Sequence, residues 1–185
     1  MQPVLDQLQQ LTQQGIKGYF IAGNRDFLVN KEFATATGFT ILDDFSTIDL
    51  YGTPTLLLHG DALCTDDIKH QTFREQIMTN TAWHTTALEK SIEERIAIAE
   101  QLRGMSAEHK MSVSDAIMDV NADSVINAFE QYGVQQMIHG HTHRPKIHQH
   151  QTITGPAERI VLGDWYTQHS FLRVDEQGYT HSNIG

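Results

Sequence analysis

Apolar positions near the start of the chain recur first with helical spacing and then in a short continuous run. Residues 3–14 place valine and leucine on one helical face among glutamines, which predicts an amphipathic helix that Gly15 ends. This segment lacks the basic region and cleavage site of a signal peptide. Residues 18–23 are mostly apolar and end in glycine, a pattern that predicts a buried strand. Asp26 is suited to the N-cap of a second helix, which Gly38 would end.

The next pattern is a pair of strands around a glycine. Residues 47–51 and 53–58 flank Gly52, which predicts a β-hairpin. The end of the second strand, Thr55-Leu-Leu-Leu58, is apolar, so we expect it to be buried. His59 follows this strand directly.

A second unit has the order helix, turn, strand. Residues 122–132 predict a helix that Gly133 ends, and residues 134–138 predict a strand. Residues 159–162 and 170–174 predict further short strands. Such units, with polar residues at the strand ends, indicate an α/β layered sheet in which ligands bind at the carboxyl ends of the strands.

Between these units, residues 66–110 have a helical pattern. Ser91 and Glu94 have the spacing of a capping box. Large apolar side chains stand among charged ones throughout the segment: Phe73, Ile77, Met78, Trp83, Leu88, Ile92, Ile96 and Leu102. From the pattern alone, a helical pair packed on the domain accounts for these residues.

Composition and charge indicate one globular domain, residues 1–185. Hydrophobic residues make up 39% and charged residues 19%, and no apolar run approaches the roughly 20 residues that span a bilayer. The net charge of -10 argues against DNA or RNA as a partner, because nucleic-acid binders usually present a basic face. Cys64 is the only cysteine, which excludes an internal disulfide and fits a reducing cytoplasm.

Polar clusters follow three of the predicted strands, and their side chains can bind metal. The clusters are Gly23-Asn24-Arg25-Asp26, His59-Gly60-Asp61 and Gly140-His141-Thr142-His143. Asparagine, histidine and aspartate suit Mn²⁺, Fe²⁺ or Zn²⁺, and the glycines beside them allow a close approach of the backbone. Each cluster alone is compatible with a polar turn. The three in this order, each after an apolar strand, favour a metal site.

These clusters resemble the motifs of the calcineurin-like metallophosphoesterases and, within that superfamily, of the UDP-2,3-diacylglucosamine diphosphatases. The resemblance is carried by Gly-Asn-Arg-Asp-Phe-Leu at 23–28, Leu-His-Gly-Asp at 58–61, Leu-Cys-Thr-Asp-Asp at 63–67, Ala-Ile-Met-Asp-Val-Asn at 116–121 and Ile-His-Gly-His-Thr-His-Arg-Pro at 138–145. It runs over nearly the full length. It implies an α/β layered calcineurin-like sandwich with a helical lid insertion at residues 66–110.

The resemblance also implies a function. Members of this family are metal-dependent hydrolases of lipid A biosynthesis that cleave the pyrophosphate of UDP-2,3-diacylglucosamine to UMP and lipid X, which is 2,3-diacylglucosamine 1-phosphate. The family implies two Mn²⁺ ions in a complete site. It also implies peripheral association with the cytoplasmic face of the bacterial inner membrane, so the expected partners are the lipid-linked nucleotide and the membrane surface.

Site residues follow from the resemblance by motif match. Asn24, His59 and His141 are implied ligands of one metal, and His143 is an implied ligand of the other. Asn24, Arg25 and His141 form the implied catalytic set and also contact substrate. Arg25 stands where many relatives carry a histidine that can act as a general acid. Arginine does not donate a proton near pH 7, but it can neutralise charge that develops on the phosphates.

Further substrate contacts are implied within residues 66–110. Asp67 and Ser106 match positions that contact substrate in the family. The family often places a lysine where this chain has Val113, and Lys110 can supply that charge instead.

The sequence departs from the family before Asn24. The family opens with an Asp-X-His motif and a Gly-Asp-X-X-(Asp or Glu) motif, and neither precedes Asn24 in these 185 residues. The two motifs supply several metal ligands, including the carboxylate that bridges both ions. We therefore expect a fold that lacks the first strands of the family. We also expect a polypeptide of these residues to bind at most one Mn²⁺ tightly and to hydrolyse substrate negligibly.

The resemblance changes the interpretation of residues 66–110. They become a lid that holds two acyl chains and touches the membrane, with Met78, Trp83 and Ile92 as candidate acyl contacts. Two other functions stay open: a calcineurin-like phosphodiesterase that acts on nucleotides, and a non-catalytic protein that holds a single metal. The long apolar insertion favours the lipid substrate.

Overall fold

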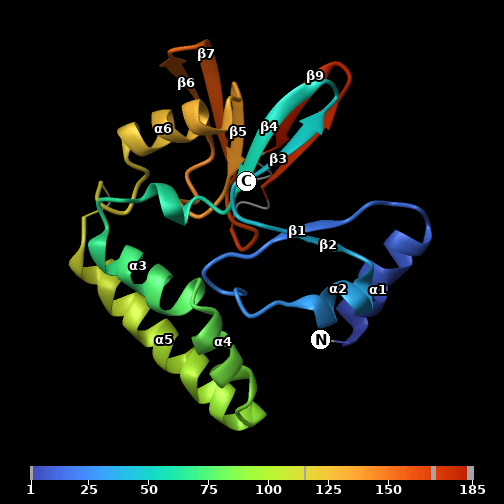
Figure 1. Ribbon diagram of the computed structural model, residues 1–185, viewed down its shortest axis with the longest axis vertical. Helices are drawn as coiled ribbons and strands as arrows, with labels where there is room; N and C mark the ends of the chain where they lie inside the picture. Colours follow the sequence, from blue (N-terminus) through green and yellow to red (C-terminus); the bar gives the residue numbers. More distant parts are fainter. Residues whose placement is uncertain (1, 115, 168–169, 183–185) are drawn as a thin grey trace.

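A five-stranded mixed sheet forms the centre of the computed structural model, which describes residues 2–114, 116–167 and 170–182, without the side chains of residues 110, 181 and 182. Its strands, in spatial order, are β3 (Ser46–Leu50), β4 (Thr53–Leu58), β5 (Gln136–His139), β7 (Gly155–Val161) and β6 (Lys146–Thr152). Strands β4, β5 and β7 are parallel, while β3 and β6 are antiparallel edges. The mixed sheet and its helices confirm the α/β class (Figure 1).

The β3–β4 hairpin forms where the sequence predicts it. Tyr51 and Gly52 make the two-residue turn with φ of 52° and 86°, the left-handed backbone that such hairpin turns require. In β4, Leu56 is fully buried and Leu58 is 4% exposed. The expected burial of this strand is confirmed.

Helix α6 (Ala122–Tyr132) covers one face of the sheet (Figure 1). The Asn121 side chain caps it by accepting from the Ser124 amide, and Gly133 ends it in a left-handed conformation. Both ends agree with the prediction. The buried face of the helix joins the sheet in the main core, which consists of Leu56, Leu58, Leu63, Val125, Ala128, Phe129, Val134, Met137 and Ala157.

The N-terminal part forms a separate small layer. Helices α1 (Gln2–Gln13) and α2 (Lys31–Thr37) pack together beside a two-stranded parallel sheet of β1 (Tyr19–Ile21) and β2 (Thr40–Leu42). The predicted strand exists, but the expectation that it is buried is wrong. Tyr19 is 50% exposed, because β1 lies outside the five-stranded sheet and pairs with β2 in a sheet of only two strands.

The N-cap predicted at Asp26 is also wrong. Asn30 caps α2 by accepting from the Glu32 amide. Asp26 instead accepts a hydrogen bond from the Gly23 amide at 2.6 Å, which closes a turn directly after β1. Because this turn uses the carboxylate locally, the helix begins one turn later. Gly38 ends the helix as predicted, with φ of 75°.

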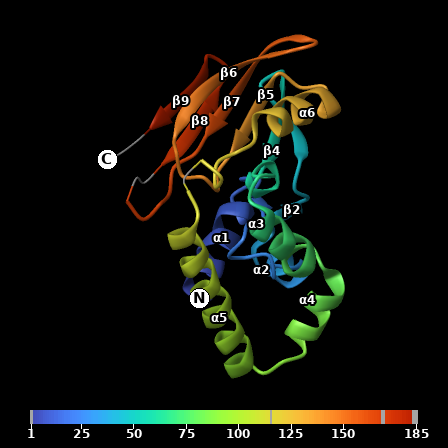
Figure 2. The same ribbon diagram turned by 90° about the vertical axis from the view of Figure 1, so that its left-hand side faces the viewer.

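The lid segment is helical, as predicted. After a 3-10 turn η1 (Asp61–Leu63), it consists of α3 (Ile68–Phe73), the π-helical turn η2 (Arg74–Met78), α4 (Thr81–Leu88) and α5 (Ile92–Ser112). The capping box of Ser91 and Glu94 is present at the start of α5. Helices α3 and α4 lead away from the sheet and α5 returns toward it (Figures 1 and 2).

The two ends of the lid segment are tied together where they leave the sheet. The Asn121 amide donates to the Leu63 carbonyl at 2.8 Å, and the Asn121 side chain donates to Asp66. The hydroxyls of Thr65 and Ser124 are 2.9 Å apart. Entry and exit of the lid therefore share one hydrogen-bonded junction.

The chain continues into a further hairpin of β8 (Phe171–Asp175) and β9 (Gly178–Ser182). Strands β7 and β8 cover the two short strands predicted in this part, although β7 begins before the predicted residue. Strands β2, β6 and β9 were not predicted. Among the described residues, no helix is both long enough and apolar enough to cross a membrane.

Candidate functional site

The site begins where β4 and β5 end side by side. The two strands are parallel, and Leu58 pairs with His139, so the residues after each strand emerge at the same edge. The Gly140 amide donates to the His59 carbonyl at 3.0 Å and joins the two loops. This arrangement follows from local sequence, because apolar runs form the adjacent parallel strands and glycines follow them.

Asn24, His59 and His141 come together at this edge. The Nδ1 atom of His141 is 3.2 Å from the Nε2 atom of His59, and the Asn24 backbone amide is 3.4 Å from the same Nε2 atom. Gly23 makes the approach possible, because a Cβ atom there would stand 2.6 Å from the His59 ring. Three loops thus meet on His59, and the role of these residues as metal ligands stays a prediction.

The loop after β5 has an unusual backbone. His141 and His143 have φ of 62° and 53°, in the left-handed region that non-glycine residues rarely adopt. Such conformations cost about 1–3 kcal/mol each and persist where surrounding contacts enforce them. The His143 side chain is exposed, two residues beyond His141. No observation assigns it to a second metal, and that role stays a prediction.

The surroundings of His141 keep its imidazole neutral. Burial, with a smaller contribution from the neighbouring His59, lowers the pKa of His141 to about 3. A neutral imidazole presents a lone pair, which is the form that binds a metal. Burial raises the pKa of Asp61, but the hydrogen bond with His70 and the charges of His59 and Arg74 outweigh burial and lower it overall.

Three residues that support the site have no signal in the local sequence. The Asp44 side chain accepts from the His59 amide at 2.9 Å and from Arg74 at 2.6 Å. Arg74 also lies 3.4 Å from the carboxylate of Asp61, which is 1% exposed. His70 lies 3.4 Å from the same carboxylate, and its ring centroid is 5.1 Å from that of His141. These contacts join separate elements, so no local spacing announces them.

These residues fit part of a metal coordination shell. Two imidazoles and an amide are suitable donors for a divalent cation. Within the described part of the chain, no group of three or more His, Cys, Asp or Glu side chains is arranged to hold a metal ion. Asn24, His59 and His141 therefore form a partial donor set that needs further ligands.

A cavity of about 950 Å³ lies between the lid and the loop after β1. Its lining combines Asn24 and Arg25 with His70 and with helices of the lid. Apolar side chains form much of the wall: Phe27, Leu28, Phe73, Ile77, Trp83, Ile98 and Leu102. The basic residues in the lining are Arg25, Lys69, Arg95 and Arg103, and the acidic one is Glu108. The cavity suits an anionic ligand with a large apolar part.

The lid residues named from the sequence have different places. Ser106 and Trp83 line the cavity, and the Trp83 ring centroid is 5.9 Å from that of Phe27. Met78 is 8% exposed and is not in the lining, so it belongs to the packing of the lid. Ile92 is 62% exposed and also lies outside the lining.

Asp67 is engaged by the protein itself. Its carboxylate caps α3 by accepting from the His70 amide, and it lies 2.8 Å from His109 Nε2 on α5. It is 5% exposed. A substrate contact by Asp67 stays a prediction beside this structural role. The side chain of Lys110 lies outside the described part of the structure, so its predicted substrate contact is untested.

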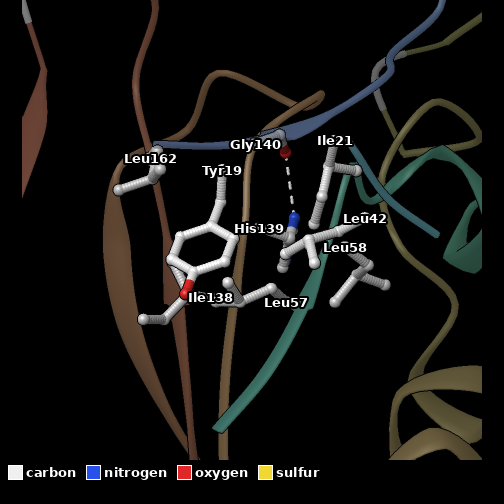
Figure 3. Close-up of a pocket in the computed structure, with 9 residues that line it drawn as sticks. All are labelled: Tyr19, Ile21, Leu42, Leu57, Leu58, Ile138, His139, Gly140 and Leu162. Carbon is white, nitrogen blue, oxygen red and sulfur yellow. Dashed lines mark hydrogen bonds between the residues drawn. The ribbon is translucent and has the colours of Figure 1, made fainter. Parts of the chain in front are cut away.

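A smaller cavity of about 220 Å³ separates the two-stranded sheet from the five-stranded one. Figure 3 shows Tyr19, Ile21 and Leu42 from the small sheet facing residues of the larger sheet. The lining is mostly apolar, with His139 and Gly140 at one side, and none of the candidate metal ligands lines it.

Comparison with known proteins agrees with the motifs. Residues 2–145 match the sequence profile of a family described as calcineurin-like phosphoesterase. A UDP-2,3-diacylglucosamine hydrolase of Actinobacillus succinogenes is 45% identical over 175 residues, which cover 94% of this chain and 72% of the relative. A protein of the same name from Vibrio vulnificus is 44% identical over 178 residues, 96% of this chain and 72% of the relative. A protein of this name from Stenotrophomonas maltophilia is 45% identical over 184 residues, which cover 96% of this chain and 74% of the relative.

Proposed function

This chain belongs to the calcineurin-like phosphoesterase family, and we propose that it is a hydrolase of the diphosphate bond of UDP-2,3-diacylglucosamine. The three relatives described above carry this substrate in their name and match at least 94% of the chain. The proposed products are UMP and lipid X, in the biosynthesis of lipid A.

The observation that carries the proposal is the cavity beneath the lid. Asn24 and Arg25, which belong to the candidate catalytic set, line the same space as Phe73 and Trp83. A substrate that carries a diphosphate and long apolar groups can contact both parts at once. Arginine and lysine outnumber carboxylates in the lining although the chain has a net charge of -10. A nucleotide without acyl chains would leave most of the apolar wall unused.

The family uses a divalent metal. We propose Mn²⁺, held by Asn24, His59 and His141, with His143 directed to a second ion. A bound cation of this kind polarises phosphoryl oxygens and lowers the pKa of water. The donor set in this chain is partial, which supports the expectation that a polypeptide of these residues holds at most one ion tightly.

The chain itself supplies positioning and charge. Arg25 is exposed beside Asn24 and lines the cavity, where its guanidinium can neutralise charge that develops on the phosphates. The departing phosphate has a second pKa of about 6, so it needs little protonation near neutral pH. Ser106 offers a hydroxyl within the same cavity.

We further propose a peripheral association with the cytoplasmic face of the inner membrane. The substrate is an amphiphile that must leave a lipid surface. Ile92, Ile96 and Met105 on α5 are each more than half exposed, at 62%, 53% and 57%. Apolar side chains of this kind on a lid helix can enter the interface of a bilayer.

The test is UMP release from UDP-2,3-diacylglucosamine with added Mn²⁺. Two proteins are compared: the 185-residue polypeptide, and a version with an Asp-X-His and Gly-Asp-X-X-(Asp or Glu) segment of a relative joined upstream. We expect the extended version to release UMP and the 185-residue polypeptide to release little. Calorimetry with Mn²⁺ should show no more than one tight site in the 185-residue polypeptide, and none after His59→Ala.

Other outcomes separate the alternatives. Comparable rates in the two proteins would show that the assignment of the metal ligands is wrong. Release from UDP-sugars without acyl chains, at a rate equal to that with the lipid, would favour a nucleotide phosphodiesterase. Tight binding of one metal without hydrolysis by either protein would favour the non-catalytic alternative.

A further inference from the structure

The ring of His139 is buried beneath the candidate metal centre and is hydrogen-bonded on both sides. Its Nδ1 atom is 2.9 Å from the Gly140 carbonyl oxygen, a contact drawn as the dashed line in Figure 3. Its Nε2 atom is 2.9 Å from the guanidinium of Arg159 on β7. His139 is 1% exposed and Arg159 is 5% exposed, so water does not compete for either contact.

The two partners fix which nitrogen of His139 carries the proton. The carbonyl oxygen of Gly140 can only accept, and the guanidinium of Arg159 can only donate. Both contacts are satisfied only when Nδ1 is protonated and Nε2 is not. The two partners together therefore select one tautomer of a neutral imidazole. Arg159 is held in turn by the Nε2 atom of His150 on β6, at 3.3 Å from its Nε atom.

The ring of His139 also contacts the other loop of the centre. A Cβ atom at Gly60 would stand 2.6 Å from the Nδ1 atom of His139, so the backbone directly after His59 passes against this ring. The Gly140 carbonyl that the ring binds directly precedes His141, whose φ is 62°. One buried imidazole thus supports both loops that carry the central histidines.

We propose that Arg159 and His139 are positioning residues of the metal centre. Arg159 donates to the unprotonated Nε2 atom and holds the ring in place, and the Nδ1–H group of His139 holds the Gly140 carbonyl and thereby the backbone of His141 beside His59. The effect on metal binding rests on the proposed function, in which His59 and His141 are ligands. Residues that orient metal ligands typically change affinity about 10- to 100-fold when substituted.

The first experiment measures the tautomer of His139 by long-range ¹H–¹⁵N NMR on the metal-free 185-residue protein. We expect protonated Nδ1 and unprotonated Nε2 in the wild type. Arg159→Met leaves the Gly140 carbonyl as an acceptor, so Nδ1 should stay protonated, but Nε2 loses its donor and its ¹⁵N resonance should shift. Arg159→Lys keeps a donor and should restore the wild-type resonance. A wild-type ring protonated at Nε2, or an Nε2 resonance unchanged in Arg159→Met, would overturn the proposal. The wild-type spectrum tests the tautomer even if a variant does not fold.

The second experiment measures Mn²⁺ affinity by calorimetry. Arg159→Met should bind about 10- to 100-fold more weakly, and Arg159→Lys should recover most of the affinity. The matched control is Glu158→Gln, the preceding residue, whose carboxylate contacts Gln149 and Tyr179 instead of His139. The control should leave affinity unchanged. An equal loss in the control and in Arg159→Met would reduce Arg159 to a residue of strand stability and overturn the proposal.

The experiments distinguish failure of the proposed metal site from failure of the positioning role of Arg159. If His141→Ala leaves Mn²⁺ affinity unchanged, the proposed metal site is wrong, and the NMR result still decides whether Arg159 fixes His139. If His141→Ala abolishes binding but the Nε2 resonance of His139 does not respond to Arg159→Met, the metal site stands and the positioning role fails.

Discussion

The Nδ1 atom of His141 lies 3.2 Å from the Nε2 atom of His59, although 82 positions separate the two residues in the chain. The contact exists because β4 and β5 are parallel neighbours whose carboxyl ends meet. Neither ring stands alone, since Asn24 approaches the same Nε2 atom from a third loop. Displacing one of these loops should therefore disturb the others.

Gly23→Ala should displace the His59 ring without unfolding the protein. The added Cβ atom would stand 2.6 Å from the ring, which is closer than atoms of this kind approach. We expect Mn²⁺ affinity to fall by about tenfold or more, as when the groups that orient a metal ligand are altered. Calorimetry with Mn²⁺ measures the loss, and a melting curve checks the fold.

The matched control is Gly104→Ala. Gly104 lies within α5, where a Cβ atom meets nothing within 4 Å. Alanine in a helix interior is about 1 kcal/mol more favourable than glycine, so this variant should be slightly more stable and should bind Mn²⁺ normally. Unchanged affinity in Gly23→Ala would remove His59 from the ligand set.

Arg74→Met should lower the free energy of unfolding by about 3 kcal/mol, because it leaves the carboxylate of Asp61 buried without its cation. The variant also loses the 2.6 Å contact with Asp44, which holds the His59 amide. Urea unfolding at pH 7 measures the change. The control is Arg173→Met, whose ion pair with Asp175 at 3.8 Å is exposed and should matter little. A loss of equal size in both variants would contradict the assigned role of Arg74.

Acid should destabilise the metal-free protein well before its carboxylates are protonated. Burial lowers the pKa of His139 from 6.5 to about 4. Between these two values the unfolded chain binds a proton that the folded protein does not, so stability is present above pH 6.5 and is lost as the pH falls toward 4. The shift corresponds to about 3 kcal/mol.

The measurement is urea unfolding from pH 7.5 to 4.5 in the presence of a chelator. His139→Gln should show a smaller loss of stability over this range, whatever its stability at pH 7.5. Its slope will not be zero, because burial lowers the pKa of His141 as well. An identical pH dependence in wild type and variant would contradict the buried, neutral state of His139.

Trp83→Ala should weaken the binding of an amphiphile with two acyl chains by about 10- to 100-fold, because a truncated aromatic side chain removes about 1.5–3 kcal/mol of apolar contact. Trp83 lines the cavity beside Phe27, whereas Ile92 on the same lid is exposed outside it. Ile92→Ala is therefore the control for binding from detergent-free solution. Binding is followed by fluorescence of a labelled diacyl ligand. Equal effects of the two substitutions would argue against the cavity as the acyl site.

Local rules predicted the elements whose signals lie within a few residues. The capping box of Ser91 and Glu94 and the helix end at Gly133 both depend on neighbours three or four positions away, and both are confirmed. The N-cap at Asp26 failed for the same local reason, because its carboxylate is used by the Gly23 amide. The exposure of Tyr19 depends on which sheet receives β1, and no pattern within the strand contains that information.

The candidate site shows the same division. The order of the motifs pointed to Asn24, His59 and His141, and the structure brings these residues together. Their supports could not be predicted from spacing. Arg159 reaches His139 across a strand pairing, and Asp44 reaches His59 from the loop before β3. Such contacts depend on strand order, which becomes visible only in the folded sheet.

The junction between Leu63 and Asn121 makes the outer part of the lid an interchangeable module. Because the segment leaves and rejoins the sheet at one hydrogen-bonded point, its part beyond η2 can change in length and sequence without moving the strands that carry His59 and His141. His70 and Arg74 have to stay, because they contact Asp61 and Asp44. Substrate choice and bond cleavage can then evolve as separate traits. Grafting a different helical segment beyond Met78 would change the wall of the cavity while His70, Arg74 and the histidine edge stay as they are.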